Sequence, residues 1–348
     1  MFWNKSSKEE PIKKKFCLIG WYGQRAHGDD IMEITTKRLF EDVAKTHRIS
    51  VEWVNEKQAD LVIVGGGTII GVDSMCIYER LKNIKTPMIF FGSGFRREKR
   101  NISKENIRKM KELFKKATLK GVRGYLSQQF LIHIGIEDSE VIGDPSITFK
   151  PIKVERLTGK FKVGICIRSM GKTGELQYTD NQTNFINIAN ICDYLIEQYQ
   201  ATLYFFNLTE NVHDSDSEGI DEAISKMRYK GNHTIIPFER NTEEIFSLLA
   251  QMNYIVSQRL HPTIIGWIQG IPHIALEYQF GKTDDFMQSI GMGEFVIRTD
   301  EFNIEIYKKK LILLLKEKET IISHAKESVD YWSKKQEDFA NRCLNLII

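Results

Sequence analysis

Short apolar runs alternate with amphipathic segments along most of this 348-residue chain, and this alternation limits its fold more than any other feature. Strands buried in a parallel sheet give continuous apolar runs, and the helices that connect them give amphipathic ones. The alternation extends from Phe16 to about residue 142, weakens, and restarts at Phe161. We therefore expect an α/β protein built from two Rossmann-like domains that face each other across a cleft.

The weak stretch between the two blocks, residues 144–160, contains Pro145, Pro151 and scattered charges, as a linker does. The expected organisation is a basic tail over 1–15, an N-terminal domain over 16–150, a C-terminal domain over 156–300 and a helical segment over 301–348. Strands are expected at 16–20, 51–54, 60–64, 88–91, 161–167, 201–206, 233–236, 254–257 and 273–276, with further short elements near 119–122 and 140–142. Helices are expected at 30–45, 103–116 and 185–198, and from 303 onward.

The charge balance argues against nucleic acid as a partner, because the formal net charge is only +3. An anionic small molecule needs no more than a local cluster of Arg and Lys. The five cysteines are far apart and form no C-x-x-C pair, which argues against a zinc ribbon or a disulfide framework. The composition leaves the oligomeric state open.

No signal peptide is expected, because residues 1–16 contain no apolar core long enough for one. No membrane span is expected, because no apolar run reaches about 18 residues. We therefore expect a cytoplasmic protein. Phe2 and Trp3 stand beside several lysines, and such a combination can rest on an anionic membrane surface. A solvated tail explains the same residues, so peripheral contact with the inner face of the plasma membrane is the second interpretation.

Glycines and aspartates follow two of the expected N-terminal strands. Gly66 and Gly67 belong to a Gly-Gly-Gly run after the apolar residues 61–64, where backbone amides can face an anion. A tight turn without a ligand explains this run equally well. Asp29 follows Gly28 after the first strand, and a carboxylate there can hold or deprotonate sugar hydroxyls. Helix capping accounts for one of the adjacent aspartates, Asp29 or Asp30, but not for both.

The most specific local cluster is Arg259-Leu260-His261, between the strand at 254–257 and a helix with Pro262 in its first turn. Arg259 offers a bidentate fork for phosphate or carboxylate, and the helix N-terminus adds partial positive charge. His261 can donate or accept a proton near neutral pH. We therefore expect an anion site with acid–base chemistry at this strand end.

Other residues can form a second wall of the same site, although a solvated surface also explains each of them. Glu277, Tyr278 and Lys282 follow the strand at 273–276, and Arg168 ends the strand at 161–167. The stretch 92–97, which ends in Arg96 and Arg97, can add positive charge from the N-terminal domain.

No metal and no nucleotide cofactor is expected. Asp214-Ser-Asp216 matches the D-x-D pattern that holds a metal in many glycosyltransferases, but such a triplet arises easily in a polar stretch. No other spaced set of ligands supports a metal. The G-x-G-x-x-G and Walker A sequences are both absent, which argues against a dinucleotide oxidoreductase.

In this order, the motifs resemble those of the polysaccharide pyruvyl transferase family, over roughly residues 16–291. The matching segments are 20–23, 28–29, 60–67, 122–131, 143–145, 259–261 and 272–282. The resemblance implies a fold like that of the two-domain GT-B glycosyltransferases, with phosphoenolpyruvate as donor substrate. It also implies that Arg259, Leu260 and His261 bind this donor, with Arg168 as a second donor-binding arginine. Ala26 stands where the family usually has Asn, with His27 beside it.

The expected activity is transfer of a pyruvyl group from phosphoenolpyruvate to two hydroxyls of a sugar, which forms a cyclic ketal. The acceptor is expected in a bacterial surface polysaccharide or in its polyprenyl-diphosphate-linked precursor. His261 is the expected general acid, and Asp29 is expected to orient or deprotonate the acceptor. Two alternatives remain at this point: a nucleotide-sugar-dependent glycosyltransferase of the same architecture, and a non-catalytic protein of polysaccharide assembly.

Overall fold

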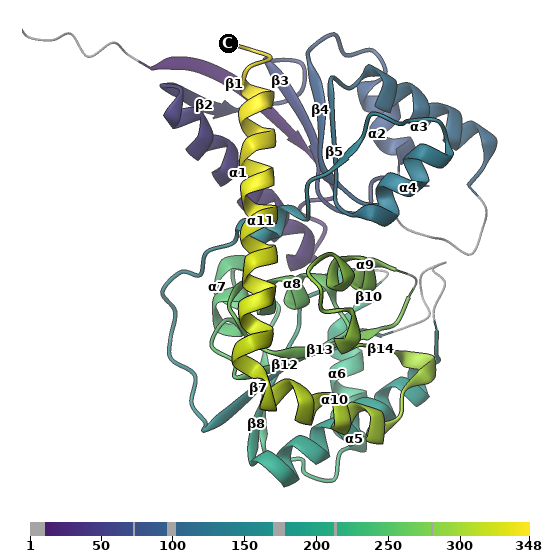
Figure 1. Cartoon of the computed structure of the whole chain (residues 1–348), viewed down its shortest axis with the longest axis vertical. Helices are drawn as coiled ribbons and strands as arrows, with labels where there is room; N and C mark the ends of the chain where they lie inside the picture. Colours follow the sequence, from purple (N-terminus) through teal and green to yellow (C-terminus); the bar gives the residue numbers. More distant parts are fainter. Residues whose placement is uncertain (1–10, 72–73, 96–101, 170–177, 212–213, 280) are drawn as a thin grey trace, which may run out of the picture.

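Two six-stranded parallel sheets form the framework, one in each half of the chain (Figure 1). The computed structural model describes residues 11–71, 74–95, 102–169, 178–211, 214–279 and 281–348. The strand order is β2-β1-β3-β4-β5-β6 in the N-terminal sheet and β11-β8-β7-β12-β13-β14 in the C-terminal sheet. The predicted α/β fold with two parallel sheets is therefore confirmed.

The N-terminal strands are β1 Ile12–Ile19, β2 Ile49–Trp53, β3 Leu61–Gly65, β4 Met88–Ser93, β5 Leu119–Val122 and β6 Glu140–Val141. The helices of this half are α1 His27–Thr46, α2 Ser74–Leu81, α3 Lys104–Lys116, α4 Tyr125–His133 and the 3₁₀ helix η1 Pro145–Thr148. Every residue of β3 and β4 is buried, as expected for inner strands of a sheet covered by helices on both faces.

The C-terminal sheet contains β7 Phe161–Cys166, β8 Ala201–Phe206, β11 His233–Ile236, β12 Tyr254–Ser257, β13 His273–Glu277 and β14 Val296–Arg298. A short antiparallel pair, β9 Glu210–Asn211 and β10 Asp214–Ser215, lies outside it. The helices are α5 Asn181–Tyr199, α6 Asp216–Lys226, α7 Thr242–Leu249, α8 Leu260–Ile268, α9 Lys282–Ser289, α10 Ile304–Lys316 and α11 Lys318–Leu344, with 3₁₀ turns η2 Gly293–Phe295 and η3 Thr299–Glu301.

The first strand begins earlier than predicted. Residues 12–15, expected to belong to the tail, pair in register with β2, and Lys13 forms an ion pair of 2.8 Å with Glu52. Lys13, Lys14 and Lys15 hid the start of the strand, because a run of lysines is not the apolar pattern of a buried strand. They are tolerated because this end of β1 extends past its pairing with β3, which begins only at Phe16. Residues 1–10, including Phe2 and Trp3, lie outside the described residues.

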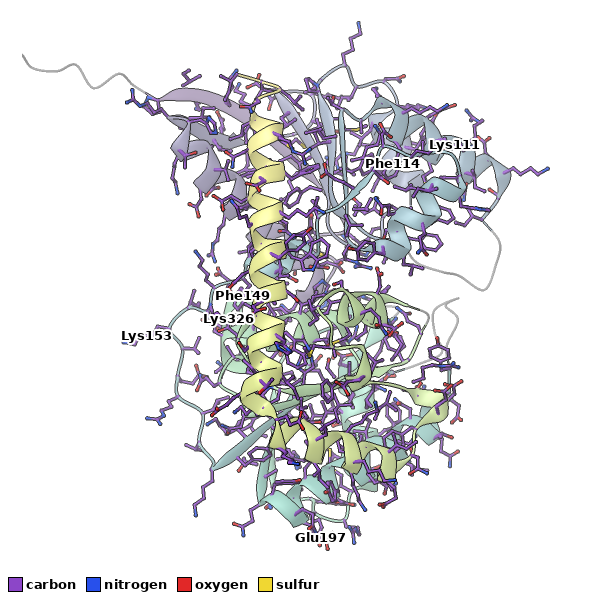
Figure 2. The ribbon with its side chains drawn as sticks, viewed as in Figure 1. Lys111, Phe114, Phe149, Lys153, Glu197 and Lys326 are labelled. Atoms are coloured by element: carbon purple, nitrogen blue, oxygen red, sulfur yellow. The ribbon has the colours of Figure 1, made fainter. Side chains whose placement is uncertain are left out.

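The connection between the sheets contains η1 and then no strand or α-helix from residue 149 to residue 160. Phe149 packs edge-on against Phe246 of α7, with ring centroids 6.2 Å apart. Figure 2 labels Phe149 near the level where the halves meet and Lys153 farther along the connection. This stretch coincides with the predicted linker, and the exact domain limits stay a prediction.

Helix α11 connects the two halves, since it rises from the C-terminal half and ends beside the N-terminal sheet (Figure 1). Phe339 of α11 is fully buried, 5.9 Å from the Phe91 ring of β4. Nearer its start, Trp332 donates a hydrogen bond to the carbonyl of Ser289 at the end of α9. The predicted helical C-terminus therefore completes the core of the N-terminal sheet as well.

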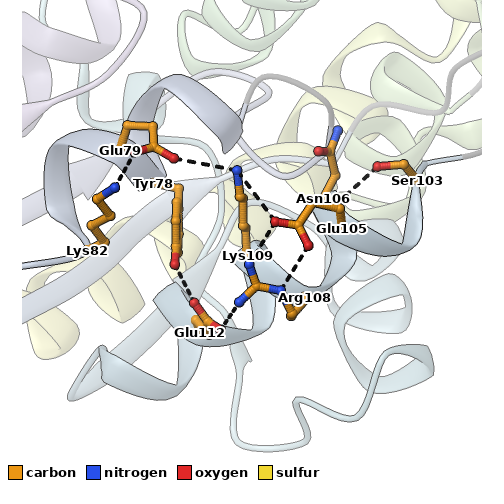
Figure 3. A network of polar contacts seen from close by, with 9 residues as sticks. All are labelled: Tyr78, Glu79, Lys82, Ser103, Glu105, Asn106, Arg108, Lys109 and Glu112. Carbon is orange, nitrogen blue, oxygen red and sulfur yellow. Dashed lines mark hydrogen bonds and ion pairs between the residues drawn. The ribbon is translucent and has the colours of Figure 1, made fainter.

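Helices α2 and α3 are joined by a network of exposed charges (Figure 3). Glu79 of α2 binds Lys109 of α3 at 3.5 Å, and Arg108 bonds to Glu105 and Glu112 on its own helix. Exposed ion pairs contribute little free energy each, about 0–1 kcal/mol, so this network fixes orientation more than stability. Among the described residues, no helix is both long and apolar enough to cross a membrane.

We expect Phe339→Ala to lower the free energy of unfolding by about 3–5 kcal/mol, because it leaves a cavity between α11 and the N-terminal sheet. Lys326→Ala, on an exposed position of the same helix (Figure 2), should change it by no more than about 0.5 kcal/mol. Urea denaturation of both variants measures the difference. Equal effects would show that α11 is not part of the core.

Candidate active site

The start of α1 is fastened to the C-terminal half. The amide of His27 donates to the carbonyl of Leu208 at 3.0 Å, and the amide of Glu210 donates to the carbonyl of Arg25, also at 3.0 Å. Between them, Ala26 forms an isolated antiparallel bridge with Thr209. We call this contact of residues 25–28 with residues 208–210 the seam. It brings the first turn of α1 up to the carboxyl ends of the C-terminal strands.

The imidazole of His27 strengthens the seam. Its Nδ1 lies 2.7 Å from Oγ1 of Thr242, and its Nε2 lies 2.9 Å from the carbonyl oxygen of Phe238. Burial lowers the pKa of His27, so the neutral ring that these two partners satisfy is favoured. His27 therefore joins the two halves. Ala26, where the family usually has Asn, lies in the backbone bridge to Thr209.

The glycine run brings the backbone close to Asp29. Gly66 and Gly67 have φ values of +73° and +71°, which favour glycine, and a Cβ on Gly67 would lie 3.1 Å from Oδ1 of Asp29. The amide of Gly66 donates to the carbonyl of Phe91, and that of Gly67 to the sulfur of Met32. In this structure these two amides therefore face protein acceptors, and their binding of an anion stays a prediction.

Asp29 lies in the first turn of α1, at the seam. Withdrawal from water raises its pKa to about 7; Lys282 and Arg123 oppose this rise, and the neighbouring Asp30 and Asp144 add to it. A carboxyl group with such a pKa changes protonation near neutral pH and can take a proton from a hydroxyl. The candidate base is thus in a suitable environment.

Arg259 is positioned by a buried carboxylate. Its backbone caps α8, and its guanidinium donates to Oδ1 of Asp216, whose other oxygen accepts from the amide of Leu208 at 3.0 Å. Asp216 is fully buried, whereas the Arg259 side chain keeps 14% of its surface exposed. The second aspartate of the D-x-D triplet therefore orients the arginine.

His261, in the first turn of α8, packs against the seam. A Cβ on Gly28 would overlap Nδ1 of His261, so the glycine is what allows the two halves to approach here. Burial lowers the pKa of His261 to about 4; Asp144 opposes this, while Arg123, Lys282 and Arg259 add to it. In the ligand-free protein the ring is therefore neutral at pH 7.

Lys282 and Leu260 line one small pocket together with Arg123 and Asp144. Arg123 follows β5 in the N-terminal half, and Lys282 opens α9 in the C-terminal half. Both cations act on Asp29 and on His261. The structure therefore groups Asp29, Arg259, Leu260, His261 and Lys282, which the sequence placed far apart.

The remaining predicted residues form two structural contacts beside this group. Arg168 donates to the hydroxyl of Tyr278, and its guanidinium carbon lies 4.9 Å from the centre of that ring. Glu277 accepts a hydrogen bond of 2.8 Å from the amide of Asp284 and so caps the start of α9. Burial raises the pKa of Glu277 to about 7.

Glu277 and Asp284 also line a larger hollow of about 460 Å³, with Tyr178, Arg298 and Lys310 on its other walls. The predicted cations Arg96 and Arg97 lie outside the described residues. Within the described parts of the chain, no group of three or more His, Cys, Asp or Glu side chains is arranged to hold a metal.

Sequence reasoning assigned no role to Asp144, Arg123, Asp216 or Asp285. Asp285 of α9 accepts from the amide of Leu126 at 3.1 Å and so ties α9 to the start of α4 in the other half. Asp144 and Arg123 each follow a strand of the N-terminal sheet, β6 and β5, and this strand-end position is a signal that could have identified both.

Comparison with known proteins agrees with this geometry. Among solved structures, the chain resembles Anabaena HepE in complex with UDP and glucose (12% identity, 95% of this chain and 98% of that chain, TM-score 0.55). It also resembles S. aureus MnaA with UDP (11%, 91% and 91%, 0.57) and sucrose-phosphate synthase from Thermosynechococcus elongatus (10%, 96% and 99%, 0.60). At such identities these likenesses show the fold alone, which is the GT-B-like arrangement of two α/β halves.

No curated protein matches the chain. A sequence model described as polysaccharide pyruvyl transferase matches residues 3–279, which is most of the chain and includes every residue of the grouped site except Lys282. With the GT-B-like fold and the grouped strand-end residues, this match establishes that the chain belongs to the polysaccharide pyruvyl transferase family.

Proposed function

We propose that this protein transfers the pyruvyl group of phosphoenolpyruvate to two hydroxyls of a sugar and so forms a cyclic ketal. The observation that carries the proposal is the contact of His261 with Gly28, which joins the Arg259-Leu260-His261 motif to Asp29. A candidate anion site and a candidate base from opposite halves thereby lie close together. Family membership supports the transferase class, and we propose the donor and the ketal in addition.

The donor carries a phosphate and a carboxylate, so its site needs several cationic groups. Arg259, oriented by Asp216, binds one anion, and the first turn of α8 adds its backbone dipole. Lys282, at the start of α9, adds positive charge beside the same anion. Arg168 is the second donor-binding arginine. Leu260 packs on the carbon frame, and Tyr278 keeps Arg168 in place.

The reaction begins with a proton moving from His261 to the methylene carbon, which leaves cationic character on the neighbouring carbon. An anionic donor next to His261 favours the imidazolium, so binding raises the pKa of this group from its low ligand-free value. One sugar hydroxyl attacks that carbon while Asp29 accepts its proton. Phosphate leaves, and the second hydroxyl closes the ketal. Of the two hydroxyl protons, one replaces the proton lost by His261 and the other leaves with phosphate.

The acceptor in this proposal is a sugar of a bacterial surface polysaccharide or of its polyprenyl-diphosphate-linked precursor. The protein then works in the cytoplasm at the inner face of the plasma membrane. Lys13 and Lys15, exposed at the start of β1, suit an anionic surface. The hollow beside Glu277 offers room for further sugar units next to the reacting one.

We expect phosphoenolpyruvate to raise the thermal stability of the wild-type protein, by about 2.7 kcal/mol at a hundred times the dissociation constant. Arg259→Ala should abolish this shift, because it removes the main anion contact. Arg108→Ala, on the exposed face of α3, should retain it. A shift with UDP-, GDP- or CMP-sugars but none with phosphoenolpyruvate would replace the pyruvyl proposal with a nucleotide-sugar transferase. A shift with neither class of donor would favour a non-catalytic role.

We expect the rate of phosphate release, with a saccharide acceptor present, to fall as the pH drops through about 7, where Asp29 becomes protonated. Asp29→Asn should lower this rate by roughly a hundred- to ten-thousand-fold. Asp30→Asn is the matched control: it removes a negative charge that raises the pKa of Asp29, so the acid limb should move to lower pH with the maximal rate retained. An Asp29→Asn variant with wild-type activity would remove Asp29 from the mechanism.

A further inference from the structure

Asp144 belongs to the N-terminal half, yet it faces His261 of the C-terminal half. It follows β6 and caps η1, and its Oδ1 accepts from the amide of Ser146 at 2.9 Å and from its hydroxyl at 2.6 Å. Its carbonyl oxygen accepts a hydrogen bond of 2.7 Å from Gln336 of α11. The backbone and one carboxylate oxygen are therefore fixed by the fold.

The second oxygen, Oδ2, is held close to two nitrogens without bonding to either. It lies 3.9 Å from Nε2 of His261 and 3.8 Å from Nη1 of Arg123. Within the described part of the chain, neither Oδ2 of Asp144 nor Nε2 of His261 has a hydrogen-bond partner, although the Asp144 side chain is only 1% exposed. A buried carboxylate oxygen without a hydrogen bond destabilises a fold, so a structural cap alone does not explain this residue.

The His261 ring cannot turn freely away from Asp144. Its Nδ1 edge packs on Gly28, where even a methyl group would overlap it, and this leaves the Nε2 edge toward Asp144. The seam and the turn at Asp144 thus hold the two groups at a fixed separation. At about 4 Å in a poorly hydrated site, a carboxylate stabilises an imidazolium far more than it does in water.

The other charged groups around His261 make this carboxylate important. Arg123 after β5, Lys282 at the start of α9 and Arg259 at the cap of α8 are all cationic and disfavour the imidazolium. From α1 the nearby acid is Asp29, which the mechanism uses as a base. Asp144 is therefore the carboxylate whose charge is available to His261 throughout the reaction.

We infer that Asp144 is the counter-ion of His261, a positioning residue that keeps the imidazolium protonated until its proton passes to the methylene carbon of the donor. This inference rests on the proposed function for its chemistry, but the pairing itself does not depend on the donor. After the transfer, His261 is neutral and lies between the same partners, with Asp144 beside Arg123.

Asp144→Asn tests the inference, because the amide oxygen can still accept from Ser146 while the charge is lost. We expect kcat to fall on the order of a hundredfold and the basic limb of its pH profile to move to lower pH. The dissociation constant of phosphoenolpyruvate should be unchanged or smaller, because a negative charge beside an anion is gone. A purely structural role would instead weaken binding and stability together.

Ser146→Ala is the control, since it removes one bond to Asp144 but no charge. It should leave the pH profile in place, whatever its effect on stability. An Asp144→Asn variant with a wild-type profile and kcat would overturn the inference. So would an equal displacement of the profile in Ser146→Ala.

A titration of ¹³C-labelled histidine separates this inference from the proposed function. In the ligand-free protein, Asp144→Asn should lower the pKa of His261, with the signal assigned from a His261→Gln variant. An unchanged pKa would overturn the pairing, even if the protein turns over phosphoenolpyruvate. A lowered pKa in a protein that neither binds nor turns over phosphoenolpyruvate would support the pairing and reject the proposed function.

Discussion

The site depends on the backbone contact between residues 25–28 and residues 208–210. Without this seam, Asp29 of the N-terminal half and His261 of the C-terminal half would lie apart, and each half would present only part of a binding surface. The halves pack tightly at Gly28, because any side chain there would overlap the His261 ring. Helix α11 and the Asp285 bond to α4 hold the halves together at other places. Holding groups from both halves in a fixed alignment can account for much of the rate enhancement of a reaction in which two hydroxyls must reach one carbon.

The electrostatics of the cleft follow from this closeness. Arg123, Lys282 and Arg259 surround two carboxylates and one imidazole that have lost much of their water. In the ligand-free protein the cations and burial keep His261 neutral. An anionic donor would offset those cations, and the charge of Asp144 would then favour the imidazolium. The low ligand-free pKa of His261 is therefore compatible with its proposed role as an acid, since the donor completes the set of charges.

The sequence predicted the limits of β8 and β12 correctly, because these inner parallel strands leave a continuous apolar run. The limits of β11 also match, although β11 is an edge strand with exposed residues. The start of β1 and the short β14 escaped prediction, because lysines and an arginine interrupt the apolar pattern there. The strand-end rule brought Asp29, Arg259, His261 and Lys282 to one cleft in advance. It did not predict the partners Asp216 and Asp144, nor the bonds of His27 to the other half, since these join residues far apart in sequence and depend on how the halves dock.

A crystal structure of the protein with phosphoenolpyruvate would test the central claim most directly. We predict that the phosphate and carboxylate contact Arg259 and the first turn of α8, with the methylene carbon within about 3.5 Å of Nε2 of His261. We also predict an open path from the neighbouring carbon to Asp29. Phosphoenolpyruvate bound away from α8, or a nucleotide sugar with its sugar carbon beside His261 in its place, would contradict the account.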